Sequence, residues 1–176
     1  MKRAPHIHVT AAPGAHTGLL RMAGLRFECA LGRSGLVSDK REGDGGTPVG
    51  TFALRAIRYR QDRLSAPRSA LPLMPIAPDD GWCDAPGDPN YNRPVSLPYP
   101  ASAEHMWRPD PLYDIVVPLG YNDDPVIDGR GSAIFFHVAN EINGRLEATA
   151  GCVALPLSQL LDVLALCKAD TMMRIG

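Results

Sequence analysis

The sequence has almost no net charge, and this absence excludes two broad classes of function. Its 18 lysines and arginines are balanced by 19 aspartates and glutamates, which gives a formal net charge of −1. A basic field that would draw the chain to nucleic acid is missing, and so is a polybasic cluster that would draw it to a membrane surface. We therefore expect no nucleic-acid partner.

The basic start of the chain is not followed by a long apolar run. Lys2 and Arg3 resemble the beginning of a signal peptide, but Pro5, His6 and His8 interrupt the segment before seven apolar residues can accumulate. We therefore expect no signal peptide and no transmembrane segment.

Spacings typical of bound metals and phosphates are missing as well. The four cysteines form no Cys-x-x-Cys pair, so a structural zinc site is not expected, although the sequence is compatible with a disulfide between Cys29 and Cys83. His6 and His8 share one side of a predicted strand without an evident third ligand. The stretch GDGGTPVG lacks the Gly-Lys-Ser/Thr ending of a phosphate loop. We predict no metal site and no cofactor.

What the sequence does contain is a sizeable core and many turns. Hydrophobic residues make up 45% of the 176 residues, and glycine and proline each occur 17 times. This composition favours one mainly β domain over residues 1–176. Leucines at helical spacing predict a single helix over 157–167, with Pro156 at its start. Alternating or β-branched runs predict strands at 6–10, 18–32 (a hairpin turning at Ala23 and Gly24), 50–60, 113–121, 132–139 and 171–176.

A proline-rich segment occupies residues 65–111, where 11 prolines leave little periodicity. An irregular stretch of this length inside a compact domain is usually functional or disordered. Its tryptophans and tyrosines favour order. We predict a lid that packs over a binding cleft and walls it with Trp107, Tyr91 or both.

His137 and Cys152 are the strongest candidates for chemistry. His137 ends an apolar strand, and Cys152 follows Gly151 and precedes a short apolar run that leads into the predicted helix. A helix N-terminus lowers the pKa of a nearby thiol, and an imidazole in reach can take its proton. Gly151 leaves room for a substrate, and the backbone N–H groups of Gly151 and Cys152 can donate to an oxyanion. The alternative is structural, with a core cysteine and a histidine that only satisfies its hydrogen bonds.

Two segments of the chain share their pattern with a known family. One combines His137 with TAGCVAL, which is similar to a histidine followed by Ser/Thr-x-Gly-Cys-Val. The other is KREGDGGTPVGTF, where the matching residues are Lys40, Glu42, Gly43, Asp44, Thr47, Pro48, Gly50 and Phe52. Together they resemble the YkuD-type L,D-transpeptidase catalytic domain. The segments YNRPV, EHMWRPD and YDIVVPLGYND resemble its proteobacterial branch, so the resemblance covers nearly the whole chain.

This resemblance implies a β-rich fold and a cysteine acyltransferase. In the family, the cysteine attacks a peptide bond between an L and a D centre in a peptidoglycan stem peptide, and the acyl-enzyme passes to an amine or to water. By position, Cys152 is the nucleophile, His137 the base and Gly151 the glycine before the nucleophile. Thr149 stands where the family has Ser or Thr. Inhibition by a carbapenem is expected if the cleft resembles the family's.

Three positions depart from the family's pattern, whose familiar block reads Ser-His-Gly-Cys-x-Arg. Ala150 replaces the second histidine, Ala154 replaces the arginine, and Val138 replaces the glycine that normally follows the first histidine. The missing arginine would help to shape the cleft or to hold a carboxylate. Arginine suits carboxylate binding, and the candidate replacements are Arg93, Arg108 and Arg130. The residues that we predict to bind substrate are Thr149, Tyr121, Asn122, Arg93, Trp107 and Arg108.

Three activities follow from this reading. The first is a transpeptidase that forms third-to-third or first-to-third crosslinks or exchanges terminal residues. The second is an L,D-carboxypeptidase that trims tetrapeptide stems during recycling, and the third is an inactive module that binds cell-wall fragments. Retention of His137 and Cys152 argues against the third. The substrate predicts a periplasmic location, whereas the lack of a visible signal peptide favours the cytoplasm and trimming.

Overall fold

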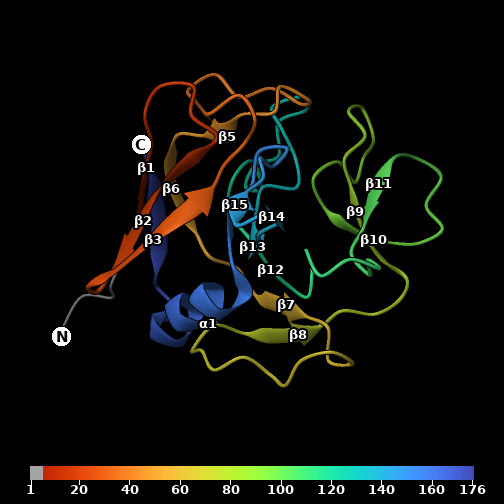
Figure 1. Ribbon diagram of the computed structural model, residues 1–176. Coiled ribbons are helices and arrows are strands. Elements are labelled where there is room, and N and C mark those ends of the chain that lie inside the picture. Colours follow the sequence, from red (N-terminus) through yellow and green to blue (C-terminus); the bar gives the residue numbers. More distant parts are fainter. Residues whose placement is uncertain (1–5) are drawn as a thin grey trace.

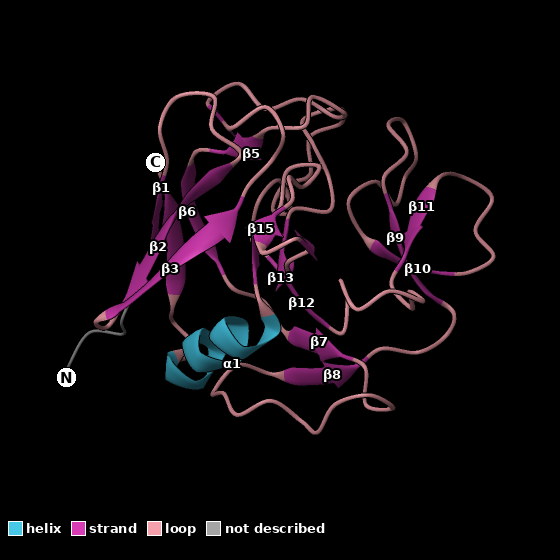
Figure 2. Ribbon diagram, in the orientation of Figure 1, coloured by secondary structure: helices cyan, strands magenta, loops and turns pink. Residues whose placement is uncertain are grey.

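A computed structural model describes residues 6–176 of the chain. It is mainly β, as the sequence predicts, with the helix α1 (Leu157–Leu166) near the C-terminus (Figures 1 and 2). A ten-stranded sheet forms most of it, and its strands are β1 (Ile7–Thr10), β2 (Thr17–Met22), β3 (Leu25–Ala30), β6 (Gly50–Ala53), β7 (Ile57–Tyr59), β8 (Leu73–Pro75), β12 (Ile115–Pro118), β13 (Phe135–Val138), β16 (Val153–Leu155) and β17 (Met172–Ile175). The shorter strands are β4 (Leu36–Val37), β5 (Thr47–Pro48), β9 (Asp80–Cys83), β10 (Pro94–Ser96), β11 (Ala103–His105), β14 (Glu141–Ile142) and β15 (Arg145–Leu146).

The order of strands brings the two candidate catalytic residues close in the sheet. The order is β6-β17-β1-β2-β3-β16-β13-β12-β7-β8, so β13 and β16 are neighbours. They run parallel, with Phe136 opposite Val153 and His137 opposite Ala154. Cys152 directly precedes β16. The pairing therefore places Cys152 beside the start of the strand that carries His137.

Strand β13 separates two cores. Phe136 faces the larger core, which also contains the apolar side of α1. Phe135 faces a smaller core toward the three-stranded sheet formed by β10, β9 and β11, where its ring meets that of Trp82 edge-on. Successive side chains of a strand point to opposite faces, so His137 shares the face of Phe135. This face of the large sheet is the one that looks toward the three-stranded sheet.

The proline-rich segment is more regular than the sequence predicts. It contains β8, at one edge of the large sheet, and the three-stranded sheet β10-β9-β11, which lies at the right in Figure 1. Trp82 of the central strand pairs with Pro94 on one side and Glu104 on the other. Strands of three or four residues are too short to show a period of two, which is why the segment looks irregular in sequence.

Most other predicted elements are confirmed, and one is divided. The hairpin of β2 and β3 turns at Ala23 and Gly24, whose φ angles of 47° and 93° suit a two-residue hairpin loop. The helix begins directly after Pro156. The predicted strand 50–60 is two strands, β6 and β7, because they pair with different partners, β17 and β12.

Residues 6–176 contain neither a disulfide nor a membrane-spanning helix. All four cysteines lie in the part of the chain that the structure describes, and all four are free thiols, so Cys29 and Cys83 are not joined. Among residues 6–176, no helix combines the length with the apolar composition that crossing a bilayer requires.

Candidate active site

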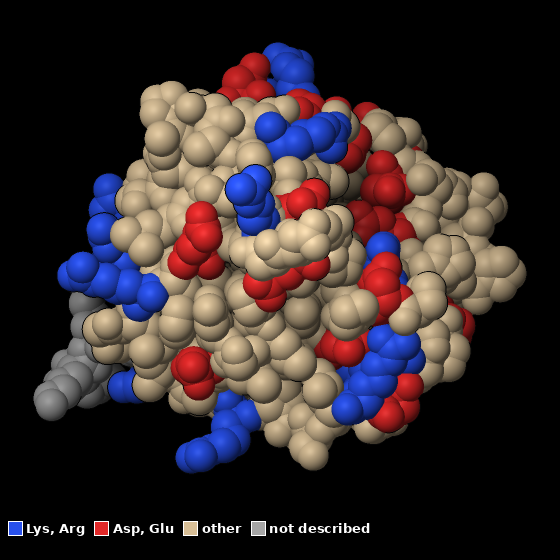
Figure 3. All heavy atoms as spheres, viewed as in Figure 1, with Lys and Arg blue, Asp and Glu red and all other residues tan. Residues whose placement is uncertain are grey.

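A cavity of about 350 Å³ is lined from both sheets, and Cys152 and His137 both line it. The large sheet and its loops supply the wall that carries these two residues. The segment of the three-stranded sheet supplies Asp84, Glu104 and Arg108 to the facing wall. Figure 3 shows acidic side chains gathered over the boundary between the main body and this sheet. Neither Trp107 nor Tyr91, the two predicted wall residues, lines the cavity.

Cys152 is held in a backbone cradle. Its Sγ accepts a hydrogen bond from the Phe135 N–H at 3.3 Å, and its thiol donates to the Ala133 carbonyl oxygen at 3.3 Å. Burial raises the pKa of this thiol to about 12, and the charge of Glu104 adds to the rise. The Phe135 N–H and the charge of Lys40 act in the opposite direction. The resting residue is therefore a neutral thiol near neutral pH.

The prediction that a helix N-terminus lowers the pKa of Cys152 is wrong. Strand β16 separates Cys152 from α1, which begins at Leu157. The favourable field of a helix end extends over about one turn. The short apolar run after Cys152 reads in sequence as a lead into the helix, but it is paired in the centre of the sheet with β13.

His137 is also neutral in this environment. Burial lowers its pKa to about 4, although the carbonyl groups of Val138 and Leu112 favour the charged ring. Nδ1 lies 2.8 Å from the Val138 carbonyl oxygen, and the ring packs edge-on against Tyr113 with centroids 5.4 Å apart. The imidazolium–thiolate pair expected from the sequence is therefore not the resting state. A neutral imidazole is nevertheless the form that can accept a proton.

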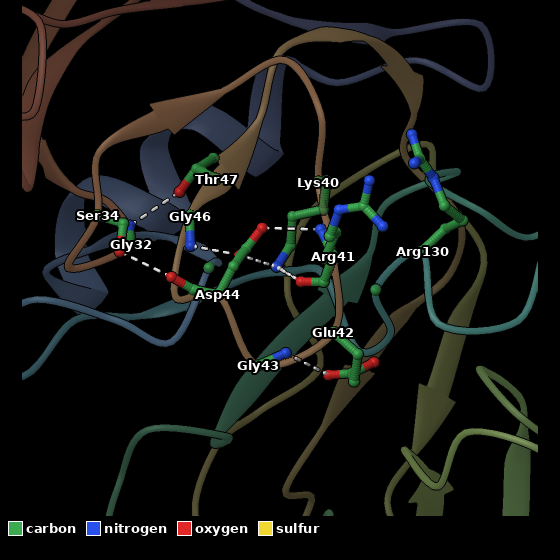
Figure 4. Close-up of polar contacts among 12 residues, drawn as sticks. Gly32, Ser34, Lys40, Arg41, Glu42, Gly43, Asp44, Gly46, Thr47 and Arg130 are labelled. Atoms are coloured by element: carbon green, nitrogen blue, oxygen red, sulfur yellow. Dashed lines mark hydrogen bonds and ion pairs between the residues drawn. The ribbon is translucent and has the colours of Figure 1, made fainter.

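The two segments that carry the family resemblance meet at the Cys152 backbone. Thr47 Oγ1 accepts a hydrogen bond from the Gly32 N–H at 2.8 Å and donates to the Cys152 carbonyl oxygen at 3.5 Å. Thr149 Oγ1 donates to the same oxygen at 2.8 Å. Figure 4 shows Thr47 and Gly32 within the network of this loop. Two hydroxyl groups from distant parts of the chain thus fix the peptide unit of Cys152.

Gly151 is needed for close backbone packing. Its φ angle is 147°, and a Cβ at this position would lie 2.8 Å from the Gly46 carbonyl oxygen. The glycine therefore lets two backbone segments touch, which differs from the predicted reason of leaving room for substrate. The Gly151 N–H donates to Thr149 Oγ1 at 3.1 Å. Of the two backbone donors predicted for an oxyanion, this one already has a partner.

Lys40 is a buried cation in the cavity wall. Its side chain is only 4% exposed, and Nζ donates to Asp44 Oδ1 at 2.5 Å and to the Arg41 carbonyl oxygen at 2.9 Å (Figure 4). The Asp44 carboxylate also accepts hydrogen bonds from the N–H groups of Arg41 and Gly46. The loop is folded around this ion pair, so the charge of Lys40 is matched by Asp44.

The three arginines predicted as replacements for the family's arginine lie in different places, and one of them lines the cavity. Of the three arginines considered, Arg108 lines it, and its guanidinium donates to both carboxylate oxygens of Asp110 at 2.9 and 2.7 Å. Arg93 lines a separate cavity of about 320 Å³. Arg130 pairs with Asp39 at 2.7 Å.

Two further cations, Arg33 and Lys40, also line the cavity. Neither was predicted as a replacement for the family's arginine. Ala154, at the position of the family's arginine, is fully buried and packs in a small cluster with Ala30 and Ala139. A long charged side chain would have to displace this cluster. The three cations that line the cavity therefore come from other parts of the chain.

The remaining residues predicted to bind substrate differ in position. Thr149 lines the cavity. The hydroxyl of Tyr121 donates to the Arg130 carbonyl oxygen, and the side chain of Asn122 binds the backbone of residues 127 and 131, so both order a neighbouring loop. The ring of Trp107 lies under the Arg60 guanidinium at 3.6 Å.

Sequence reasoning did not select several polar residues of the cavity. Glu42 belongs to the family-like segment, which was a usable signal. Asp84 and Glu104 both stand in the proline-rich segment, where Glu104 begins the family-like stretch EHMWRPD and Asp84 lies in no such stretch. Tyr113 precedes an apolar strand and reads as a core aromatic. Its buried ring is part of the smaller core, while its hydroxyl donates to the Glu104 carboxylate.

The comparison with known families assigns the chain to a class. The model of the YkuD family, described as the L,D-transpeptidase catalytic domain, matches residues 17–175. This range includes Cys152, His137 and the loop around Lys40. The chain therefore belongs to the YkuD family, an enzyme family that acts on peptidoglycan stem peptides. No curated protein and no solved structure matches the chain significantly.

Proposed function

We propose that this protein is an L,D-transpeptidase that works through an acyl-enzyme on Cys152. The observation that supports the proposal is the joint position of Cys152 and His137 on one wall of a cavity of about 350 Å³, held by neighbouring parallel strands. Sites on paired central strands are positioned more rigidly than sites on loops. We place the activity in the periplasm, where the substrate lies.

The first half-reaction starts from two uncharged groups. The Cys152 thiol keeps its proton and the His137 ring is free to accept it, because burial moves both pKa values toward the neutral forms. As the sulfur attacks the carbonyl carbon of the L–D peptide bond, His137 takes the thiol proton. The backbone N–H of Cys152 is the predicted donor to the oxyanion. Collapse expels the D residue, whose amine leaves with the proton from His137.

The second half-reaction transfers the acyl group. An amine of another stem peptide attacks the thioester and loses a proton to His137. An amide forms, the C–S bond breaks, and the Cys152 sulfur takes that proton. The acidic side chains of the cavity favour an amine acceptor, because carboxylates attract an ammonium group more than they attract water. This preference of the carboxylates for an ammonium group over water supports transfer over hydrolysis.

Incubation with a purified disaccharide-tetrapeptide, read by mass spectrometry, tests the proposal. Crosslinked dimers indicate transfer, and a tripeptide product indicates an L,D-carboxypeptidase. Unchanged substrate indicates a module that only binds cell-wall fragments, and it would remove the proposed function. The Cys152→Ala variant is the control, since any product that it forms does not come from the acyl-enzyme.

A further inference from the structure

The cavity carries negative charge that the protein itself leaves unmatched. Its four carboxylates are Glu42, Asp84, Glu104 and Glu147. None of them belongs to an ion pair within residues 6–176. Two of the cavity's three cations, Lys40 and Arg108, are neutralised by Asp44 and Asp110 instead. The third, Arg33, belongs to no ion pair among residues 6–176, so four unpaired carboxylates stand against one unpaired cation. A positively charged group of a substrate would therefore be favoured beside Cys152.

Glu104 is the carboxylate tied most directly to the catalytic pair. It accepts a hydrogen bond from the Tyr113 hydroxyl, and the ring of Tyr113 packs edge-on against His137. Its charge also acts on Cys152. Burial raises the pKa of Glu104, and the hydrogen bond from Tyr113 opposes the rise. A carboxylate with a raised pKa is a better proton acceptor than an ordinary one.

The other carboxylates are less suited to this position. The side chain of Glu42 already accepts hydrogen bonds from the hydroxyls of Tyr91 and Ser132. Glu147 is exposed. Asp84 differs, because its Oδ1 is buried without a hydrogen-bond partner among the described residues, and its charge acts on Glu104. Asp84 is therefore placed to share a cation with Glu104.

We propose that Glu104 binds the ammonium group of the acyl acceptor and takes one of its protons, with Asp84 holding the same group. This inference rests on the proposed transpeptidase function. The deprotonated amine forms a bond to the acyl carbon, and its second proton passes to His137. The C–S bond then breaks, the Cys152 sulfur takes that proton, and Glu104 releases its own proton to solvent. One ammonium and one thioester give one amide, one thiol and one proton.

The test separates acylation from transfer. Glu104→Gln keeps the size of the side chain and an oxygen for Tyr113, but it removes the charge. With the disaccharide-tetrapeptide as donor, we expect the rate of acyl-enzyme formation to stay within about threefold and the ratio of dimer to hydrolysed tripeptide to fall at least about tenfold. Glu141→Gln, on the exposed strand β14 outside the cavity, is the matched control and should keep the wild-type ratio.

A second acceptor distinguishes proton transfer from a structural role. Hydroxylamine is already neutral at the assay pH and does not need a base, so the Glu104→Gln variant should transfer its acyl group to hydroxylamine at close to the wild-type rate. A variant that is merely misfolded would lose both acceptors and acylation. If Glu104→Gln folds poorly, Asp84→Asn replaces it, with a raised KM for the amine acceptor as the expected result.

The outcomes also separate this inference from the function on which it rests. A wild-type protein that forms dimers, together with a Glu104→Gln variant that forms them in the same ratio, overturns the role of Glu104 alone. A loss of transfer to hydroxylamine equal to the loss with the stem-peptide amine overturns it as well. A wild-type protein that forms no acyl-enzyme overturns both the proposed function and this inference.

Discussion

The two walls of the cavity come from regions of opposite character. The wall that carries Cys152 and His137 is built on β13 and β16, in which every residue is buried. The facing wall carries Asp84, Glu104 and Arg108 and is built on short strands and loops, and β11 has no buried residue at all. Packing therefore fixes the positions of Cys152 and His137, while the charged residues of the facing wall lie on less buried strands and loops.

The difference between the two walls predicts a different role for each, with the reaction on one wall and the choice of acceptor on the other. On the buried wall, desolvation decides the protonation states and keeps Cys152 and His137 neutral. On the facing wall, Asp84 and Glu104 line the cavity and can attract a charged partner, although burial also raises the pKa of Glu104. Changes in the first wall should stop the reaction, whereas changes in the second should alter which acceptor is used.

The largest effect is expected at the nucleophile. Cys152→Ala should reduce turnover by at least about 10⁴-fold, because no acyl-enzyme can form. The chain should stay folded, since only one sulfur is removed from a well-packed site. Product analysis by mass spectrometry together with thermal unfolding checks both statements. Cys167→Ala is the control, because Cys167 is buried in the core beside α1 and should affect stability but leave turnover unchanged.

The next effect is expected at the base on the same wall. His137→Gln should slow acylation by about 10² to 10⁴-fold, because the sulfur loses its proton acceptor. The measurement is the rate at which intact protein gains the mass of an acyl group from donor peptide or from a carbapenem. A variant that acylates at the wild-type rate would contradict the assignment of the base and would weaken the comparison between the walls.

Much of the buried wall could be predicted from the sequence. The runs around Phe135 and Phe136 predict a strand, which is confirmed as β13. The reactivity of Cys152 stays a prediction. Local spacing cannot tell which strands pair, however. The register that puts His137 opposite Ala154 depends on contacts between distant residues. The raised pKa of Cys152 depends on burial by the whole fold, which is why the expected lowering was wrong.

The facing wall could not be read in the same way. Asp84 and Glu104 reach the cavity because β9 and β11 pair within a small sheet that has no periodic signal. Trp107 and Tyr91 were predicted to wall the cleft because they are large aromatic residues in an irregular segment. In the structure, Trp107 packs under Arg60, and the hydroxyl of Tyr91 donates to Glu42. Charged side chains are informative only once the fold has placed them.

A third prediction uses pH to test the burial of His137. The pKa of His137 is lowered to about 4 in the folded protein from the ordinary value of 6.5. Below pH 6.5 the unfolded chain binds a proton that the folded chain does not, so the stability should fall as the pH decreases from 6.5 to 4. The loss from this residue should total about 3 kcal/mol. Denaturant unfolding at several pH values measures it, and His137→Gln should lack this part of the pH dependence. Equal slopes in both proteins would show that the ring is solvated.

The smallest effect is expected at Trp107, which tests how far the facing wall extends. The ring lies under the Arg60 guanidinium at 3.6 Å and does not line the cavity, so Trp107→Leu should remove a cation–π contact without touching substrate. We expect a loss of stability of about 1 kcal/mol and a change of less than about twofold in KM for the stem peptide. Urea unfolding and steady-state kinetics on the same samples provide the two numbers. A large rise in KM at unchanged kcat would mean that the substrate reaches beyond Arg108 onto the aromatic ring. The facing wall would then extend beyond the cavity between the two sheets. Its charged side chains and the Trp107 ring would bind the substrate together.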